Sequence, residues 1–286
     1  MNLECIPCFQ RQAINAARMA TDDPREQAKV LKRVVTALLE EPWDQNPPLL
    51  AQRVHGIVRE ELGPDPYSKA KRESNDMALA AYTLMKDMVS RSSDPLQAAV
   101  RIAIAGNVID FGPADSFDFE GALEGCLFSD MPIDQCDAFK ERCRDSSRIL
   151  YILDNAGEIV CDRILIESIV DAYGEKEITL AVKGGYILND ATNEDVEYVG
   201  LDKLPYIDVV KVSNGERYTG IPRESDCFRA LMDTFDMIIS KGQGNYEMLS
   251  HYEDIYFLLK AKCGLIARDL GVPVGSMVCG KNSKVQ

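Results

Sequence analysis

The chain has 286 residues, which is long enough for one large α/β domain and a smaller second unit. Its composition, with 46% hydrophobic and 27% charged residues, is ordinary for a globular protein. Its 32 basic and 46 acidic residues give a net charge of −14, which argues against a general nucleic-acid-binding protein, because such binding needs clustered Lys and Arg. No stretch reaches about 18 consecutive apolar residues, so we expect no membrane partner.

The amino terminus and the cysteines predict a cytoplasmic protein. Residues Met1 to Cys5 contain neither the basic region nor the apolar core of a signal peptide. Nine cysteines, an odd number, are more typical of free thiols than of a disulfide framework. Cys5 and Cys8 form a single CxxC pair, which supplies two of the four ligands of a structural zinc site, and no second pair completes it. A redox, a metal and a purely structural role all stay open for this pair.

The first half of the chain predicts helices and almost no strands. Asp23 and Pro24 are typical of an N-cap followed by the first position of a helix. Further helices are predicted over residues 49–62, 67–89 and 95–106. We therefore predict a mainly helical domain, an amino-terminal helical bundle, over residues 1–144.

From residue 145 to residue 286 the pattern changes to an alternation of apolar strands and amphipathic helices. Six strands are predicted, over residues 149–153, 178–182, 207–212, 237–240, 255–259 and 274–278. Helical patterns lie between several of them, over residues 159–172, 223–234 and 262–270. Such alternation is typical of right-handed crossovers and of a mainly parallel sheet covered by helices on both faces. The fold class is therefore α/β.

Polar clusters follow three of the predicted strands. Asp154, Asn155 and Glu158 come after the first strand, Asp190 after the second, and residues 241–245 after the fourth. Because the carboxyl ends of adjacent parallel strands meet at one crevice, these clusters are predicted to form one site. Two carboxylates and an amide oxygen make a hard ligand set that suits magnesium or manganese, and with less selectivity cobalt or nickel.

Each cluster also has a plain structural interpretation. Asp and Asn are common after strands because they cap helices and form turns. Lys241 beside Gly242 and Gly244 resembles a phosphate cradle without the P-loop spacing, but an ordinary strand-to-helix turn fits the same residues. Residues 106–112 fit a helix C-cap and turn, but they also fit a wall of the predicted crevice contributed by the helical domain. The combination of three clusters at one sheet edge favours a functional site.

The order of these motifs resembles the metal-dependent damage-control phosphatases, also catalogued as domain of unknown function eighty-nine, and in particular their CxxC-bearing archaeal and bacterial branch. The resemblance spans nearly the whole chain. Its motifs are Cys5-Ile6-Pro7-Cys8, Asp65-Pro66-Tyr67 with Lys71 and Asn75, residues 106–112, Asp154-Asn155-Ala156-Gly157-Glu158, Asn189-Asp190, residues 241–247 and Lys262-Cys263.

The resemblance implies a fold, an activity and a set of site residues. The carboxyl-terminal part would be a Rossmann-like α/β/α three-layer sandwich beside the helical domain. A divalent cation, Mn, Mg, Co or Ni, would be held by Asp154, Asn155 and Asp190, and the substrate would be a small phosphorylated metabolite, such as a sugar phosphate or a phosphorylated cofactor precursor or its damaged form. The resemblance gives catalytic roles to Asp154 and Lys241, and it implies substrate contacts for Asn107, Asp110, Glu158, Lys241 and Asn245.

The expected reaction is hydrolysis of a phosphate ester by in-line attack, in which positioning and charge stabilisation supply most of the rate. The nucleophile would be a water or Asp154, and the absence of a DxD pair favours water. One alternative is an S-adenosylmethionine-dependent carboxyl methyltransferase, although no GxG loop follows the first strand. Another is a non-catalytic metal- or metabolite-binding protein. No signal for an oligomeric state was found.

Overall fold

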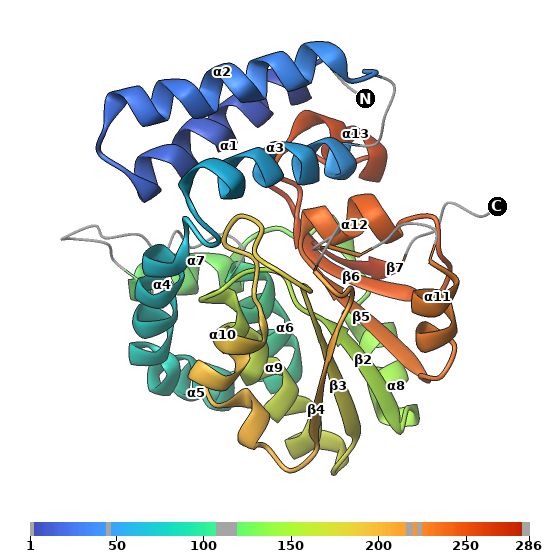
Figure 1. The fold of residues 1–286 in the computed structure, drawn as a ribbon. Coiled ribbons are helices and arrows are strands. Elements are labelled where there is room, and N and C mark those ends of the chain that lie inside the picture. Colours follow the sequence, from blue (N-terminus) through green and yellow to red (C-terminus); the bar gives the residue numbers. More distant parts are fainter. Residues whose placement is uncertain (1–2, 44–46, 107–118, 216–219, 222–224, 282–286) are drawn as a thin grey trace.

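The structure, a computed structural model, describes residues 3–43, 47–106, 119–215, 220–221 and 225–281. Seven strands in these ranges form one sheet in the order β1-β7-β6-β5-β2-β3-β4 (Figure 1). The strands are β1 (Ile133–Asp134), β2 (Arg148–Ile152), β3 (Glu177–Val182), β4 (Ile207–Lys211), β5 (Met237–Lys241), β6 (Ile255–Lys260) and β7 (Met277–Lys281). Neighbouring strands are parallel except for β6 and β7, which are antiparallel. The predicted α/β fold with a mainly parallel sheet is thus confirmed.

Helices precede and follow most strands. Those before the third strand of the chain are α1 (Cys5–Ala20), α2 (Pro24–Glu40), α3 (Pro47–Leu62), α4 (Ser68–Ala80), α5 (Tyr82–Arg91), α6 (Pro95–Ala105), α7 (Phe119–Phe128), α8 (Cys136–Asp145) and α9 (Glu158–Tyr173). The later ones are α10 (Asn193–Tyr198), a 3-10 turn η1 (Leu201–Lys203), α11 (Asp226–Met232), α12 (Gln243–Leu249) and α13 (Gly264–Leu270). As predicted, Asp23 caps α2, where its carboxylate accepts a hydrogen bond from the Arg25 amide at 2.8 Å.

The sheet has a hydrophobic core on each face, which makes the fold a three-layer sandwich. On one face α4 to α10 contribute to a core built around α6 and α9, with Ile104, Ile159 and Ile166 fully buried against strand residues such as Tyr151. On the other face α11, α12 and α13 cover a second core. The burial of apolar surface on both faces holds the parallel strands in place.

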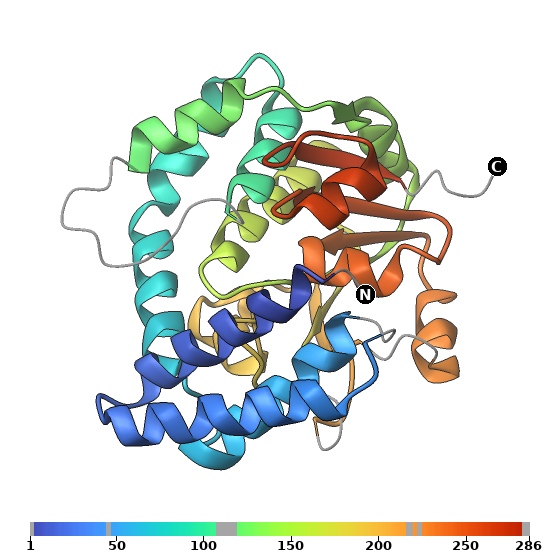
Figure 2. The same cartoon turned by 90° about the horizontal axis from the view of Figure 1, so that it is seen from above.

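Helices α1, α2 and α3 form a three-helix unit that lies over the carboxyl ends of the strands (Figure 2). This unit has a hydrophobic core of its own, which includes Phe9, Val34 and Leu50. Helices α4 to α8, in contrast, share the core of the sheet. The domain boundary predicted at residues 144 and 145 stays a prediction, and the packing of the described residues sets the three-helix unit apart from the rest.

Some predicted elements differ from the structure. The helix predicted over 67–89 is interrupted at Ala81, whose ψ of −5° departs from the usual helical value of about −42°, and forms α4 and α5. The last strand begins at Met277 rather than at residue 274, because a turn with Gly271 and Gly275 at positive φ precedes it. Strand β1 was not predicted, since two residues are too few to show a period.

None of the helices in the described ranges has both the length and the apolar composition needed to cross a membrane.

Candidate functional site

Two loops pair along their backbones and bring three of the predicted ligands together. Strands β2 and β3 are parallel neighbours, so their carboxyl-terminal loops begin side by side. The amide of Ala191 donates to the carbonyl of Asp154 at 2.8 Å, and an isolated antiparallel bridge joins Asn155 to Asp190. Asp154, Asn155 and Asp190 therefore lie at one place on the sheet edge, as the sequence predicts for a metal site.

The Asp154 side chain lies directly against a glycine. Gly242, which follows β5, has a φ of +78°, and a Cβ atom built on it would lie 1.8 Å from Asp154 Oδ2. Asn155 Nδ2 donates to the same Asp154 oxygen at 2.9 Å and to Glu158 Oε2 at 3.2 Å. Since both amide protons of Asn155 are donated to carboxylates, its Oδ1 is the atom that would face a cation.

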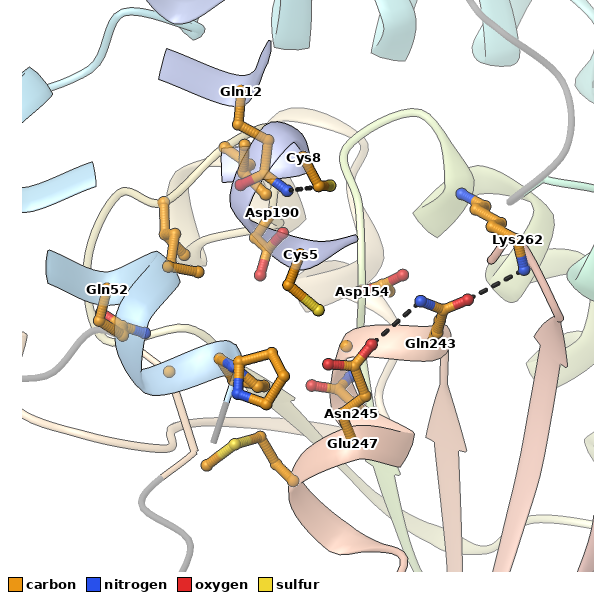
Figure 3. A pocket seen from close by; sticks show the side chains of 18 of the residues that line it. Cys5, Cys8, Gln12, Gln52, Asp154, Asp190, Gln243, Asn245, Glu247 and Lys262 are labelled. Atoms are coloured by element: carbon orange, nitrogen blue, oxygen red, sulfur yellow. Dashed lines mark hydrogen bonds between the residues drawn. The ribbon is translucent and has the colours of Figure 1, made fainter. Parts of the chain in front are cut away.

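A cavity of about 470 Å³ opens above these residues (Figure 3). Its walls come from the loops after β2, β3, β5 and β6 and from helices α1 and α3 of the three-helix unit. Its polar lining includes Asp154, Asn155, Lys183, Asp190, Asn245, Glu247 and Lys262, and its apolar lining includes Phe9, Pro48, Ile187, Met248 and Leu265. A volume of this size is sufficient for a small metabolite.

Lys183 lines this cavity beside the predicted ligands. In the sequence it belongs to the polar cluster after the second predicted strand, but no role was predicted for it. Its Nζ donates to Asn245 Oδ1 at 2.5 Å and lies 3.5 Å from Asp190 Oδ2. Asn245 is itself held by its Nδ2 group, which donates to the carbonyls of Leu153 and Lys241. The sequence did contain a signal, because Lys183 directly follows β3 and precedes two glycines, much as Lys241 ends β5 before Gly242.

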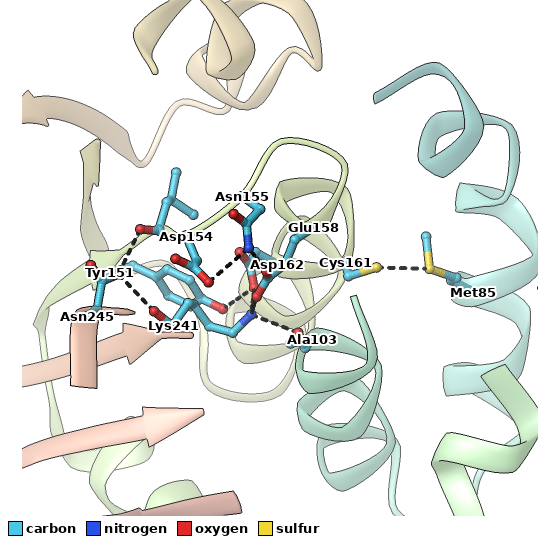
Figure 4. A network of polar contacts seen from close by, with 11 residues as sticks. Met85, Ala103, Tyr151, Asp154, Asn155, Glu158, Cys161, Asp162, Lys241 and Asn245 are labelled. Carbon is cyan, nitrogen blue, oxygen red and sulfur yellow. Dashed lines mark hydrogen bonds and ion pairs between the residues drawn. The ribbon is translucent and has the colours of Figure 1, made fainter. Parts of the chain in front are cut away.

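Lys241 lies beneath the site rather than in it (Figure 4). Its side chain is fully buried, and its Nζ donates to Glu158 Oε1 at 2.5 Å, to Asp162 Oδ1 at 2.6 Å and to the Ala103 carbonyl at 2.7 Å. All three ammonium protons have acceptors, so this arrangement gives no support to the predicted contact between Lys241 and a substrate phosphate. Glu158, a predicted substrate contact, is equally buried and binds Lys241 and Asn155.

The site carries a surplus of negative charge. Burial and the charge of Asp154 raise the pKa of Asp190, and Lys183 offsets them only in part. Burial raises the pKa of Glu158 to about 7, with Asp154 and Asp162 adding to the effect and Lys241 opposing it. A bound cation would relieve this repulsion, because it favours the ionised carboxylates. The charge and the oxygen donors of Asp154, Asn155 and Asp190 therefore fit a hard divalent cation.

A thiol-rich metal site has no comparable support. Within the described ranges no three or more His, Cys, Asp or Glu side chains are arranged to hold a metal. Cys5 and Cys8 lie in the first turn of α1 and line the cavity together with Cys263 (Figure 3 shows Cys5 and Cys8), and none of the three is in a disulfide. The predicted contacts Asn107 and Asp110 lie outside the described residues.

A mainly parallel α/β/α sandwich with oxygen ligands at its carboxyl edge defines a class of protein that binds a small ligand in the crevice above the strands. A sequence model described as the damage-control phosphatase ARMT1-like domain matches residues 1–278. The chain therefore belongs to the ARMT1-like damage-control phosphatase family, which confirms the resemblance found in the sequence.

Similar proteins support this assignment. The chain is 37% identical to a damage-control phosphatase of Pyrococcus horikoshii, over 98% of this chain and 97% of the relative. It is 33% identical to a damage-control phosphatase of Archaeoglobus fulgidus over 96% of both chains, and 36% identical to a protein of Methanocaldococcus jannaschii described as uncharacterized over 96% and 93%. The crystal structure of a DUF89 family protein from Pyrococcus horikoshii superimposes with a TM-score of 0.89, at 35% identity and 99% coverage of both chains.

Proposed function

We propose that this protein is a divalent-metal-dependent phosphatase that hydrolyses small phosphorylated metabolites, such as sugar phosphates and phosphorylated cofactor precursors or their damaged forms. The observation that carries the proposal is the convergence of Asp154, Asn155 and Asp190 at the floor of a cavity that also contains the lysine Lys183. Membership of a phosphatase family and a cavity of metabolite size agree with it.

The metal would be held by Asp154, Asn155 and Asp190. When bound there, a divalent cation such as Mn, Mg, Co or Ni supplies charge that neutralises phosphoryl oxygens during in-line displacement. Gly242 leaves room for the Asp154 carboxylate, and the two hydrogen bonds from Asn155 Nδ2 to Asp154 and Glu158 fix the orientation of the Asn155 amide. These contacts hold the side chains of Asp154 and Asn155 in position before a metal binds.

Lys183 would bind and neutralise a further phosphoryl oxygen. Its ammonium group lies between Asn245 and Asp190 in the cavity wall, so a small shift lets it bind a third acceptor. Asp154 Oδ2 already accepts a hydrogen bond from Asn155 Nδ2 and lies against Gly242, an environment that suits a metal ligand better than a nucleophile. We therefore propose a water as the nucleophile, and trapping of a phosphorylated Asp154 would contradict this part.

A direct test measures phosphate release from a panel of small phosphate esters, using metal-stripped protein with added manganese, magnesium, cobalt or nickel. We expect turnover only with metal, and we expect Asp154→Ala to lower it more than about 100-fold, because a ligand matters at least as much as the groups that orient it. Asp202→Ala, a change of an exposed carboxylate in η1, is the matched control and should retain activity.

If folded wild-type protein releases no phosphate with any metal, the phosphatase proposal is wrong. Tight binding of metal or metabolite without turnover would then favour a binding protein, and calorimetric binding of S-adenosylmethionine would favour a methyltransferase.

We also propose that the protein works in the cytoplasm, since all nine cysteines are free thiols, as is usual in a reducing compartment.

A further inference from the structure

Helix α4 buries a polar face. Its buried residues are Lys71, Asn75 and Ala78, spaced three or four apart, and Lys71 and Asn75 have only 4% and 1% of their surfaces exposed. A buried ammonium and a buried amide are costly unless they are hydrogen-bonded. Both find their partners outside α4: Gly157 in the loop after β2, Asp195 in the first turn of α10, and Asp65 just before α4 itself.

Asn75 binds the loop that follows β2. Its Oδ1 accepts a hydrogen bond from the amide of Gly157 at 2.6 Å. Gly157 has a φ of +78° and precedes the first residue of α9, two residues after Asn155. The Asn75 side chain thus satisfies a buried amide in the turn that directs Asp154 and Asn155 toward the cavity.

The other end of the Asn75 amide binds the first turn of α10, which directly follows the loop after β3. Its Nδ2 donates to Asp195 Oδ1 at 3.1 Å. The second oxygen of Asp195 accepts from the backbone amide of Thr192 at 2.9 Å and from its hydroxyl at 2.8 Å. Thr192 lies two residues after Asp190, so this capping box fixes the end of the segment that carries the third ligand.

Lys71 supplies the positive charge that balances the buried carboxylate of Asp195. Its Nζ lies 2.6 Å from Asp195 Oδ2, in an ion pair whose partners have only 5% and 8% of their side chains exposed. Asp65 adds a second carboxylate at 3.7 Å. A buried ion pair adds little net stability, and apolar residues of similar volume would hold α4 in place at least as well. Packing alone therefore does not account for this polar face.

We infer that Asn75 and Asp195, with Lys71 as counter-charge, are positioning residues: one amide side chain on α4 holds the Asp154–Asn155 loop and the Asp190 loop at a fixed separation. The effect on metal binding rests on the proposed function. The effect on the loops themselves does not, because the hydrogen bonds to Gly157 and Asp195 involve no metal.

The test compares wild type with Asn75→Ala in two measurements. Calorimetric titration with Mn²⁺ alone gives the affinity of the site, which we expect to weaken about 10- to 100-fold, as is usual when a group that orients a metal ligand is removed. Hydrogen exchange of the peptide covering residues 154–160, measured without metal, should become faster because the Gly157 amide loses its acceptor.

Tyr82→Phe is the matched control. Tyr82 on α5 also contacts α9, because its hydroxyl donates to Glu167. Without this hydroxyl Glu167 keeps Lys86 and Arg163 as partners, and it contacts neither of the two loops that carry the candidate ligands. We expect this variant to keep the Mn²⁺ affinity and the exchange rate of wild type. If Asn75→Ala does not fold, Asn75→Leu replaces it, since it keeps a similar size while losing both the acceptor for Gly157 and the donor to Asp195.

The inference is overturned if the Asn75 variant loses thermal stability while its Mn²⁺ affinity and its exchange over residues 154–160 match those of Tyr82→Phe. If wild-type protein binds none of the divalent metals, the proposed metal site fails separately. In that case the exchange measurement alone decides whether Asn75 positions the loop.

Discussion

Gly242 shows how a single missing Cβ atom controls the candidate site. We predict that Gly242→Ala displaces Asp154, because the new methyl group would lie 1.8 Å from its Oδ2. Metal-dependent phosphate release should fall more than about 100-fold, as for loss of the ligand itself.

Gly174→Ala separates this clash from backbone strain. Gly174 has nearly the same φ, +81°, but no atom lies within 4 Å of the position that an added methyl group would occupy. The control should lose about 1–3 kcal/mol of stability, measured by urea unfolding, and keep its activity. Equal losses of activity in the two glycine variants would contradict the proposed role of the contact.

Two lysines at equivalent strand ends are predicted to fail in different ways. Lys183→Met should raise KM more than about 10-fold with little loss of stability, because Lys183 lines the cavity and its removal takes away a charge-assisted contact. Lys241→Met should destabilise the fold by about 3–5 kcal/mol, because it leaves Glu158 and Asp162 buried without a counter-charge.

Thermal unfolding and steady-state kinetics of both variants provide the check. A stable Lys241→Met protein with a raised KM, beside an unaffected Lys183→Met protein, would restore the prediction made from the sequence that Lys241 binds the phosphate.

At the scale of an element, α3 carries a histidine that makes the three-helix unit sensitive to acid. Burial, with the nearby charge of Arg59, lowers the pKa of His55 to about 3 from an ordinary 6.5. Its Nε2 is 3.1 Å from Gln12 Oε1 on α1. Between these pH values the unfolded chain binds a proton that the folded chain does not, so stability falls as the pH falls below 6.5.

The slope from His55 is at most about 1.4 kcal/mol per pH unit. We predict that His55→Gln flattens the fall in unfolding free energy between about pH 6.5 and pH 5, measured with urea. His251→Gln, a change of the exposed second histidine, should leave it as in wild type. An identical pH dependence in wild type and His55→Gln would show that His55 plays no part.

Elements with a strong local pattern could be predicted from the sequence, and those defined by contacts could not. Apolar runs such as Ile149 to Leu153 identified six strands, and the core on both faces explains why no polar alternation interrupts the central strand β2. The interruption at Ala81 and the two-residue strand β1 depend on packing and pairing across the chain, which leave no periodicity in the residues themselves.

Across the whole molecule, the residues of the candidate site could likewise be predicted only where they do not depend on contacts between distant parts of the chain. Asp154, Asn155 and Asp190 could be predicted to meet because strand order alone brings their loops together. The sequence does not show which of Lys183 and Lys241 faces the cavity, because both lie at the carboxyl end of a strand and precede glycine. Their partners distinguish them: the buried carboxylates Glu158 and Asp162, on a helix far away in sequence, bind Lys241 and not Lys183.

The three-helix unit combines a hydrophobic core of its own with a wall of the shared cavity. Cavity-facing residues on α1 and α3, such as Gln12 and Gln52, can therefore be exchanged with little disturbance to the sheet that holds Asp154. In evolutionary terms, mutations in α1 and α3 would change the shape of the cavity while they leave the proposed metal ligands in place.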